Sequence, residues 1–158
     1  MISTVMEMNE HFARQILNWE YEEPYDLYSN EFSMEALEEL LDNPYFAIID
    51  NRGELIGFFC IGKSAQVPIG TYFGAYEQTH IDIGIGLKPE LTGKGLGSSF
   101  FSFILSYIEE MSGRISLRLT VAKFNSRAIH LYEKLGFTKK MEFNIEDLEF
   151  MTMVKEPR

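Results

Sequence analysis

Residues 80–98 read HIDIGIGLKPELTGKGLGS, a sequence that predicts a strand, a glycine-rich turn and the start of a helix in succession. Its first half alternates, which predicts a strand over residues 80–88 whose buried side carries Ile81, Ile83, Ile85 and Leu87. The opposite side carries a histidine, an aspartate and two glycines, and such glycines suit a close approach of backbone or ligand. The second half is a glycine-rich turn over residues 91–97. Residues 95–111 follow it with the apolar pattern of a long helix.

The turn has the features of an anion site. Gly93, Gly95 and Gly97 let the backbone approach a ligand without a Cβ in the way. The first turn of a helix leaves about four N–H groups unpaired, and its dipole adds roughly half a positive charge there. Lys94 adds a full charge and Ser98 a hydroxyl. The pattern therefore predicts a site for a phosphate-bearing ligand.

Two other phosphate motifs do not fit this turn. A P-loop requires a Lys-Ser or Lys-Thr pair after its last glycine, and none follows Gly97. A dinucleotide fingerprint reads G-x-G-x-x-G after the first strand of its unit, whereas residues 93–98 read GKGLGS late in the chain. A nucleotide phosphotransferase is therefore only a distant alternative.

The rest of the chain supplies strands and helices around this stretch. Alternation and turn signals predict strands over residues 2–6, 45–50, 54–63, 115–121, 137–143 and 148–154, with a loop over residues 67–78. Capping residues and apolar stripes predict helices over residues 9–19, 33–43 and 125–135. In the helix over residues 95–111 the expected core face is Leu96, Phe100, Phe103, Ile104, Tyr107, Ile108 and Met111. The order predicts an α/β fold with a central mixed sheet of about seven strands and helices on both faces.

Composition narrows the class of protein. The chain has 158 residues, which suits one domain over residues 1–158. A formal net charge of −10 argues against nucleic-acid or anionic membrane partners and is compatible with a cationic partner such as an amine. We expect a cytoplasmic protein without a metal site. The single cysteine, Cys60, lies in an apolar run and is expected to pack as a small buried hydrophobe.

Two segments together carry a family resemblance. The turn, residues 92–97, resembles the Gln/Arg-x-x-Gly-x-Gly/Ala motif of the GCN5-related N-acetyltransferase superfamily, except that Thr92 replaces Gln or Arg. Residues 125–137 read NSRAIHLYEKLGF and resemble the N-x-x-A-x-x-x-Y-x-x-x-G-F pattern of the same superfamily at every position. The resemblance implies a fold with splayed middle strands and direct acetyl transfer from acetyl-CoA (coenzyme A) to a primary amine.

The resemblance also implies which residues act. Tyr132 stands at the position of the usual general acid, and Asn125 at a cofactor contact that also suits a helix cap. Asp82 is the candidate general base, with a structural carboxylate as the alternative reading; Glu77, Tyr76 and His80 are further candidates. The implied cofactor contacts are Ile85, Gly86, Leu87, Thr92, Gly93, Lys94, Gly95, Leu96, Gly97, Ser98 and Asn125.

The acceptor side is expected in two aromatic stretches. By the same resemblance, residues 19–28 and 67–76 flank the acceptor, with Trp19, Tyr25, Tyr28, Tyr72 and Tyr76 as its walls; core packing or a homodimer surface is the other interpretation. The acceptor is a small-molecule amine or a protein amine. A non-catalytic acyl-CoA-binding sensor is the alternative to an enzyme.

Overall fold

The computed structural model describes residues 3–29 and 31–157, except for the side chain of Tyr28. Its strands are β1 Thr4–Glu7, β2 Tyr45–Ile49, β3 Leu55–Ile61, β4 Ile81–Leu87, β5 Leu117–Ala122, β6 Thr138–Ile145 and β7 Leu148–Lys155. Its α-helices are α1 Glu10–Leu17, α2 Met34–Asp42, α3 Gly97–Ser112 and α4 Ser126–Lys134. Short 3₁₀ helices cover Tyr25–Tyr28, Gly62–Ala65, Pro68–Phe73 and Pro89–Leu91.

The strands form a seven-stranded sheet in the order β1-β2-β3-β4-β5-β7-β6. Strand β4 pairs with β5 in parallel, whereas β1–β2, β2–β3, β5–β7 and β6–β7 are antiparallel. The parallel pairing joins Ile81 to Leu117 and Asp82 to Arg118. The predicted mixed seven-stranded sheet of the α/β class is thus confirmed.

The chain divides into two compact units, each made of two stretches. The first unit is Met1–Cys60 with Ile85–Phe100, and the second is Ile61–Gly84 with Phe101–Arg158. The boundary falls inside β4 and inside α3, so each of these elements contributes one part to each unit. The expectation of one domain over residues 1–158 stays a prediction.

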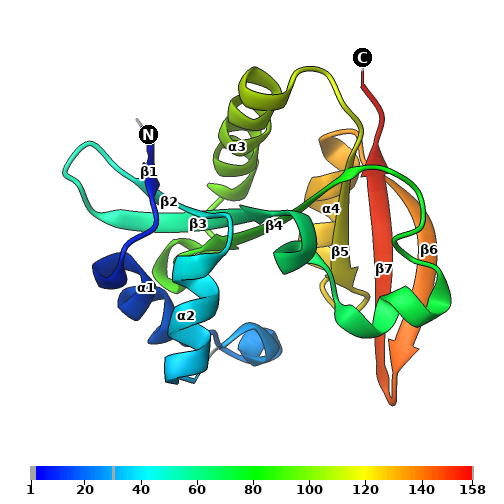
Figure 1. Ribbon diagram of the computed structural model, residues 1–158, viewed down its shortest axis with the longest axis horizontal. Coiled ribbons are helices and arrows are strands. Elements are labelled where there is room, and N and C mark those ends of the chain that lie inside the picture. Colours follow the sequence, from blue (N-terminus) through cyan, green and yellow to red (C-terminus); the bar gives the residue numbers. More distant parts are fainter. Residues whose placement is uncertain (1–2, 30, 158) are drawn as a thin grey trace. The chain divides into compact units, whose positions relative to one another are not determined.

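The first unit has its core between two helices and strands β2 and β3. Helix α1 begins where the Asn9 side chain accepts a 2.8 Å hydrogen bond from the Phe12 amide, and its apolar stripe is buried. Helix α2 begins in the same way at Ser33 and lies against α1 (Figure 1). The buried cluster is Phe12, Ala13, Ile16, Leu17, Trp19, Leu37, Leu40, Ala47 and Leu55.

In the second unit, helix α4 and the second part of α3 pack with strands β5, β7 and β6. These three strands lie side by side in Figure 1. Its centre is an aromatic stack in which the rings of Phe101 and Phe137 lie 5.8 Å apart, both nearly fully buried. A second stack joins Phe143 to Phe73 and to Phe150. Aromatic pairs of this kind contribute about 1 kcal/mol beyond their burial.

The structure corrects two local expectations. The sequence predicts a loop over residues 67–78, but Pro68–Phe73 form a 3₁₀ helix that begins at a proline and ends at Gly74 in the left-handed region. In α3, Phe101 is fully buried although the expected apolar stripe omits it, whereas Met111 is 51% exposed. The buried face of α3 therefore includes Phe101 and does not include Met111. Within residues 3–29 and 31–157, no helix is both long and apolar enough to cross a bilayer.

Candidate active site

The glycine-rich turn begins with a short helical turn locked by Thr92. The Thr92 hydroxyl donates a 2.6 Å hydrogen bond to the Pro89 carbonyl, and the Thr92 amide donates to the same oxygen at 3.1 Å. The Leu91 amide donates to the Lys88 carbonyl at 2.9 Å. Thr92 is the residue that departs from the family pattern, and its side chain stabilises the turn. We therefore assign it no direct cofactor contact.

The centre of the turn exposes its backbone. Gly93 and Gly95 have φ angles of 72° and 77°, which favour glycine, and Lys94 between them is exposed. A Cβ built on Gly95 meets no atom within 4 Å, so the space beside this residue is open. A glycine is therefore required here by its φ angle and not by packing.

The turn ends at the start of α3. The Leu96 carbonyl accepts hydrogen bonds from the Phe100 amide at 3.0 Å and from the Ser99 hydroxyl at 3.1 Å. Leucine has no side-chain acceptor, so Leu96 cannot cap the first turn of α3 as a serine or aspartate would. The binding of an anion by the first amides of this helix stays a prediction.

The glycines of β4 are partly explained by packing. A Cβ on Gly86 would lie 2.1 Å from the ring of Phe58, and a Cβ on Gly57 would lie 2.7 Å from the Gly86 carbonyl. Gly86 is thus required for the packing of Phe58, in addition to any ligand contact expected from the sequence. Ile85, Gly86 and Leu87 are all half-buried, and the Leu87 carbonyl accepts a 2.8 Å hydrogen bond from the hydroxyl of Tyr21.

Asp82 is part of a buried ion pair. The Arg118 Nε and Nη2 atoms donate to its two oxygens at 2.6 and 2.8 Å, and Gln66 donates to Oδ2 at 2.9 Å. Both charged side chains are about 95% buried. Arg118 also donates to the Gln78 carbonyl at 3.0 Å. Three donors thus engage both of its oxygens, so the geometry favours the structural reading of Asp82 over the base.

Tyr76 belongs to the same network. Its ring lies 5.0 Å from the Arg118 guanidinium carbon, and its hydroxyl lies 2.8 Å from the Thr120 hydroxyl. The Val67 amide donates to the Tyr76 oxygen at 2.9 Å. Burial raises the pKa of Tyr76 above its ordinary value. A base at neutral pH needs a lowered pKa, so this shift disfavours Tyr76 as a base.

The other candidate bases lie in the same unit. The Nδ1 atom of His80 lies 2.6 Å from the Ser116 hydroxyl, so one ring nitrogen is engaged. Glu77 is exposed, and its carboxylate lies close to Gly74. Neither arrangement singles out a residue for proton abstraction. The general base therefore stays unassigned.

Tyr132 lies on α4, and Asn125 is the residue that precedes this helix. Asn125 is buried and accepts a 3.1 Å hydrogen bond from the Ala128 amide, so it caps the helix. Tyr132 is half-buried, and its ring packs edge-on against Phe101 with centroids 5.2 Å apart. Capping by Asn125 is thus observed, whereas its cofactor contact and the acid role of Tyr132 stay predictions.

The aromatic residues expected around the acceptor differ in exposure. Trp19 is 8% exposed and packs against Phe58, which places it in the core of the first unit rather than on a substrate wall. Tyr25 is half-buried, and Tyr72 is 87% exposed. The side chain of Tyr28 lies outside the described residues. Burial argues against Trp19 as a substrate wall, whereas the acceptor role of Tyr25 and Tyr72 stays a prediction.

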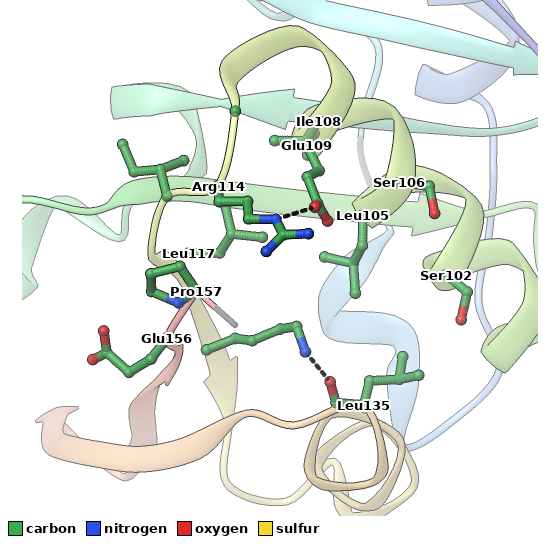
Figure 2. A pocket seen from close by; sticks show the side chains of 13 residues that line it. Ser102, Leu105, Ser106, Ile108, Glu109, Arg114, Leu117, Leu135, Glu156 and Pro157 are labelled. Atoms are coloured by element: carbon green, nitrogen blue, oxygen red, sulfur yellow. Dashed lines mark hydrogen bonds and ion pairs between the residues drawn. The ribbon is translucent and has the colours of Figure 1, made fainter.

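A pocket in the second unit has none of the predicted site residues in its lining (Figure 2). It is lined by Ser102, Leu105, Ser106, Ile108, Glu109, Gly113, Arg114, Ile115, Leu117, Leu135, Lys155, Glu156 and Pro157. Its two cations are engaged, because Arg114 lies 3.5 Å from Glu109 and Lys155 donates to the Leu135 carbonyl at 2.9 Å. The pocket thus offers no ready site for the phosphates of a cofactor.

Sequence reasoning missed two residues. Arg118 reads as one polar position in an alternating strand, and Tyr21 as one more aromatic before Pro24. Their partners lie 36 and 66 positions away, so no local pattern pairs them. One signal was available for Arg118: an arginine between the apolar residues of a strand needs a carboxylate partner if it is buried.

Comparisons with known proteins show the family of the chain. Residues 10–137 match the family described as "Acetyltransferase (GNAT) family". A 5-NmdU N-acetyltransferase of Pseudomonas phage PaMx11 is 28% identical over 115 residues, 70% of this chain and 71% of that protein. A spermidine N(1)-acetyltransferase of Vibrio cholerae is 29% identical over 134 residues, 80% of this chain and 68% of that protein.

The fold has solved counterparts. A chimeric spermidine N-acetyltransferase derived in part from Vibrio cholerae superposes with a TM-score of 0.71 at 24% identity, covering 98% of this chain and 95% of that one. The chain belongs to the acetyltransferase (GNAT) family. It is an acetyltransferase, and the predictions of this family and of an enzyme are confirmed.

Proposed function

We propose that the chain transfers an acetyl group from acetyl-CoA to the primary amine of a small molecule. The observation that carries the proposal is the turn at the start of α3, where Gly93 and Gly95 have positive φ angles and open the backbone beside Lys94. A diphosphate fits such amides and this charge. Acetyl-CoA would supply a thioester, whose acetyl group passes to the amine and whose sulfur leaves as a thiol.

The chain's own residues would act at three points. The amides of residues 93–98 bind the diphosphate, together with Lys94 and Ser98. Backbone of β4 at residues 85–87 donates to the thioester oxygen, where negative charge develops. The Tyr132 hydroxyl would give its proton to the leaving sulfur as the C–S bond breaks, once the amine nitrogen has bonded to the carbonyl carbon. The amine would lose its proton to solvent, since no residue is assigned as base, and Tyr132 would regain a proton from solvent.

The acceptor class rests on charge and on the relatives. Two proteins similar to this chain are named for N-acetyl transfer, one of them to spermidine, which is a polycationic amine. A net charge of −10 attracts such cations over distances of about a Debye length. A small cationic amine is therefore our proposed acceptor, in preference to a protein amine.

The role of the glycine-rich turn in cofactor binding can be tested by substitutions at two comparable glycines. Gly53 in the β2–β3 turn has a φ angle of 79° and nothing within 4 Å of a built Cβ, as at Gly95. Gly53→Glu and Gly95→Glu therefore introduce similar backbone strain, of about 1–2 kcal/mol. Calorimetric titration with acetyl-CoA should show a loss of affinity of at least about tenfold in Gly95→Glu alone, because its side chain covers the amides and adds like charge. Equal affinities in the two variants would mean that the turn does not bind the cofactor.

A further inference from the structure

Tyr21 joins two segments of the first unit that lie far apart in the sequence. Its hydroxyl donates a 2.8 Å hydrogen bond to the carbonyl of Leu87, the last residue of β4. Its backbone amide donates a 2.8 Å hydrogen bond to the Ser29 hydroxyl. We call residues 18–29, which follow α1, the α1–α2 segment. The amide of Tyr21 thus makes a hydrogen bond within the α1–α2 segment, and its hydroxyl makes one between this segment and β4.

The ring of Tyr21 is anchored as well as its hydroxyl. The side chain is half-buried and packs against the cluster formed by α1, α2, β2 and β3. Burial, followed by the nearby charge of Glu90, raises the pKa of Tyr21 to about 12. The hydroxyl therefore keeps its proton, and remains a donor to Leu87, throughout the pH range of an enzyme assay.

The position of the bond links two parts of the proposed site. Residues 85–87 are the proposed donors to the thioester, and the glycine-rich turn follows after Pro89. The neighbouring Lys88 amide donates to the Ile56 carbonyl at 2.9 Å, so the end of β4 is fixed to β3. The α1–α2 segment is in turn the proposed acceptor side. Packing of an aromatic ring alone would leave the segment free to slide, whereas a hydrogen bond to one carbonyl fixes its position.

We propose that Tyr21 is a positioning residue that holds the α1–α2 segment, and with it the acceptor amine, in register with the end of β4. This inference rests on the proposed function. Tyr21 touches neither the reacting atoms nor the cofactor in this proposal; it acts through the Leu87 backbone. Without its hydroxyl, the segment keeps its apolar packing but loses its fixed distance from the strand.

The test is kinetic. Tyr21→Phe removes one oxygen and leaves the ring, so the protein should fold. With spermidine as the amine, we expect KM for the amine to rise about threefold to tenfold, as the loss of one hydrogen bond predicts. The dissociation constant for acetyl-CoA should stay within about twofold of the wild-type value. Tyr45→Phe is the matched control, because it removes a hydroxyl from another half-buried tyrosine that packs on the same core.

A second variant loosens the other end of the same residue. Ser29→Ala removes the acceptor for the Tyr21 amide and should also raise KM for the amine. The double variant, Tyr21→Phe with Ser29→Ala, should raise KM for the amine by less than the product of the two single increases. Both hydrogen bonds hold the same segment, so their losses are not independent. Hydrogen exchange in residues 20–29 should be faster in Tyr21→Phe than in the wild type and unchanged in Tyr45→Phe.

The outcomes separate this inference from the proposed function. An active wild type with unchanged amine KM in Tyr21→Phe, or unchanged hydrogen exchange in residues 20–29, would overturn the positioning role and leave the function standing. A loss of acetyl-CoA affinity as large as the rise in KM for the amine would also overturn the positioning role, because Tyr21 would then act on cofactor binding. A wild type that acetylates neither spermidine nor any other primary amine would overturn the proposed function itself.

Discussion

At the scale of single residues, Asp82 shows why a carboxylate in the expected place need not be a base. Its oxygens accept two hydrogen bonds from Arg118 and one from Gln66 in a buried setting. Loss of this carboxylate charge would leave the guanidinium buried without its counter-charge. The geometry therefore favours a structural role for Asp82 over that of a general base.

Replacement of Asp82 distinguishes the two roles. Asp82→Asn should lower the free energy of unfolding by about 3–5 kcal/mol, because Arg118 is left buried with an incomplete partner. The fraction that stays folded should keep kcat within about threefold of the wild type. Urea denaturation and kinetics below the melting temperature measure the two effects. Glu10→Gln, at an exposed ion pair with Arg14, is the control and should cost under about 0.5 kcal/mol. A collapse of kcat at unchanged stability would restore Asp82 as the base.

Tyr132 is the residue on which the proposed chemistry depends most. Tyr132→Phe keeps the ring contact with Phe101 and removes the proton that we assign to the leaving sulfur. We expect kcat to fall about 100-fold with little change in acetyl-CoA affinity. Tyr107→Phe, on helix α3, serves as the comparison for the loss of a half-buried hydroxyl. Wild-type kcat in Tyr132→Phe would remove this residue from the mechanism.

At the scale of elements, the sequence predicted what depends on neighbours in the chain. The helix caps at Asn9, Ser33 and Asn125 and the glycines of the turn are local features, and they lie where the sequence placed them. The face of α3 depends instead on which surfaces meet the helix. Phe101 is buried by its stack on Phe137, a contact between distant residues that no helical stripe specifies.

The corrected face of α3 can be measured. Phe101→Ala should destabilise the protein by about 3–5 kcal/mol, since it empties a fully buried aromatic site. Met111→Ala, on the same helix, should cost under about 1 kcal/mol because the methionine is 51% exposed. Chemical denaturation of both variants gives the comparison. A larger loss for Met111→Ala than for Phe101→Ala would contradict the observed helix face.

At the scale of the whole molecule, the sequence predicted the order of the elements and the class of the sheet better than it predicted the site. Residues implied by the resemblance fall in both units: residues 85–98 with Trp19 and Tyr25 in the first, and Tyr72, Tyr76, Asp82, Asn125 and Tyr132 in the second. Motif residues were found because each motif is contiguous. The Asp82–Arg118 and Tyr21–Leu87 pairs were missed because only the folded chain brings them together.

Transfer of the acetyl group itself is the decisive property. Release of free thiol from acetyl-CoA should be measured with spermidine and a panel of other primary amines, with acetyl-CoA alone as the background. We predict thiol release that depends on a cationic small-molecule amine and a product heavier by one acetyl group. Binding of acetyl-CoA without amine-dependent thiol release across the panel would contradict the proposed function and favour a binding module without catalysis.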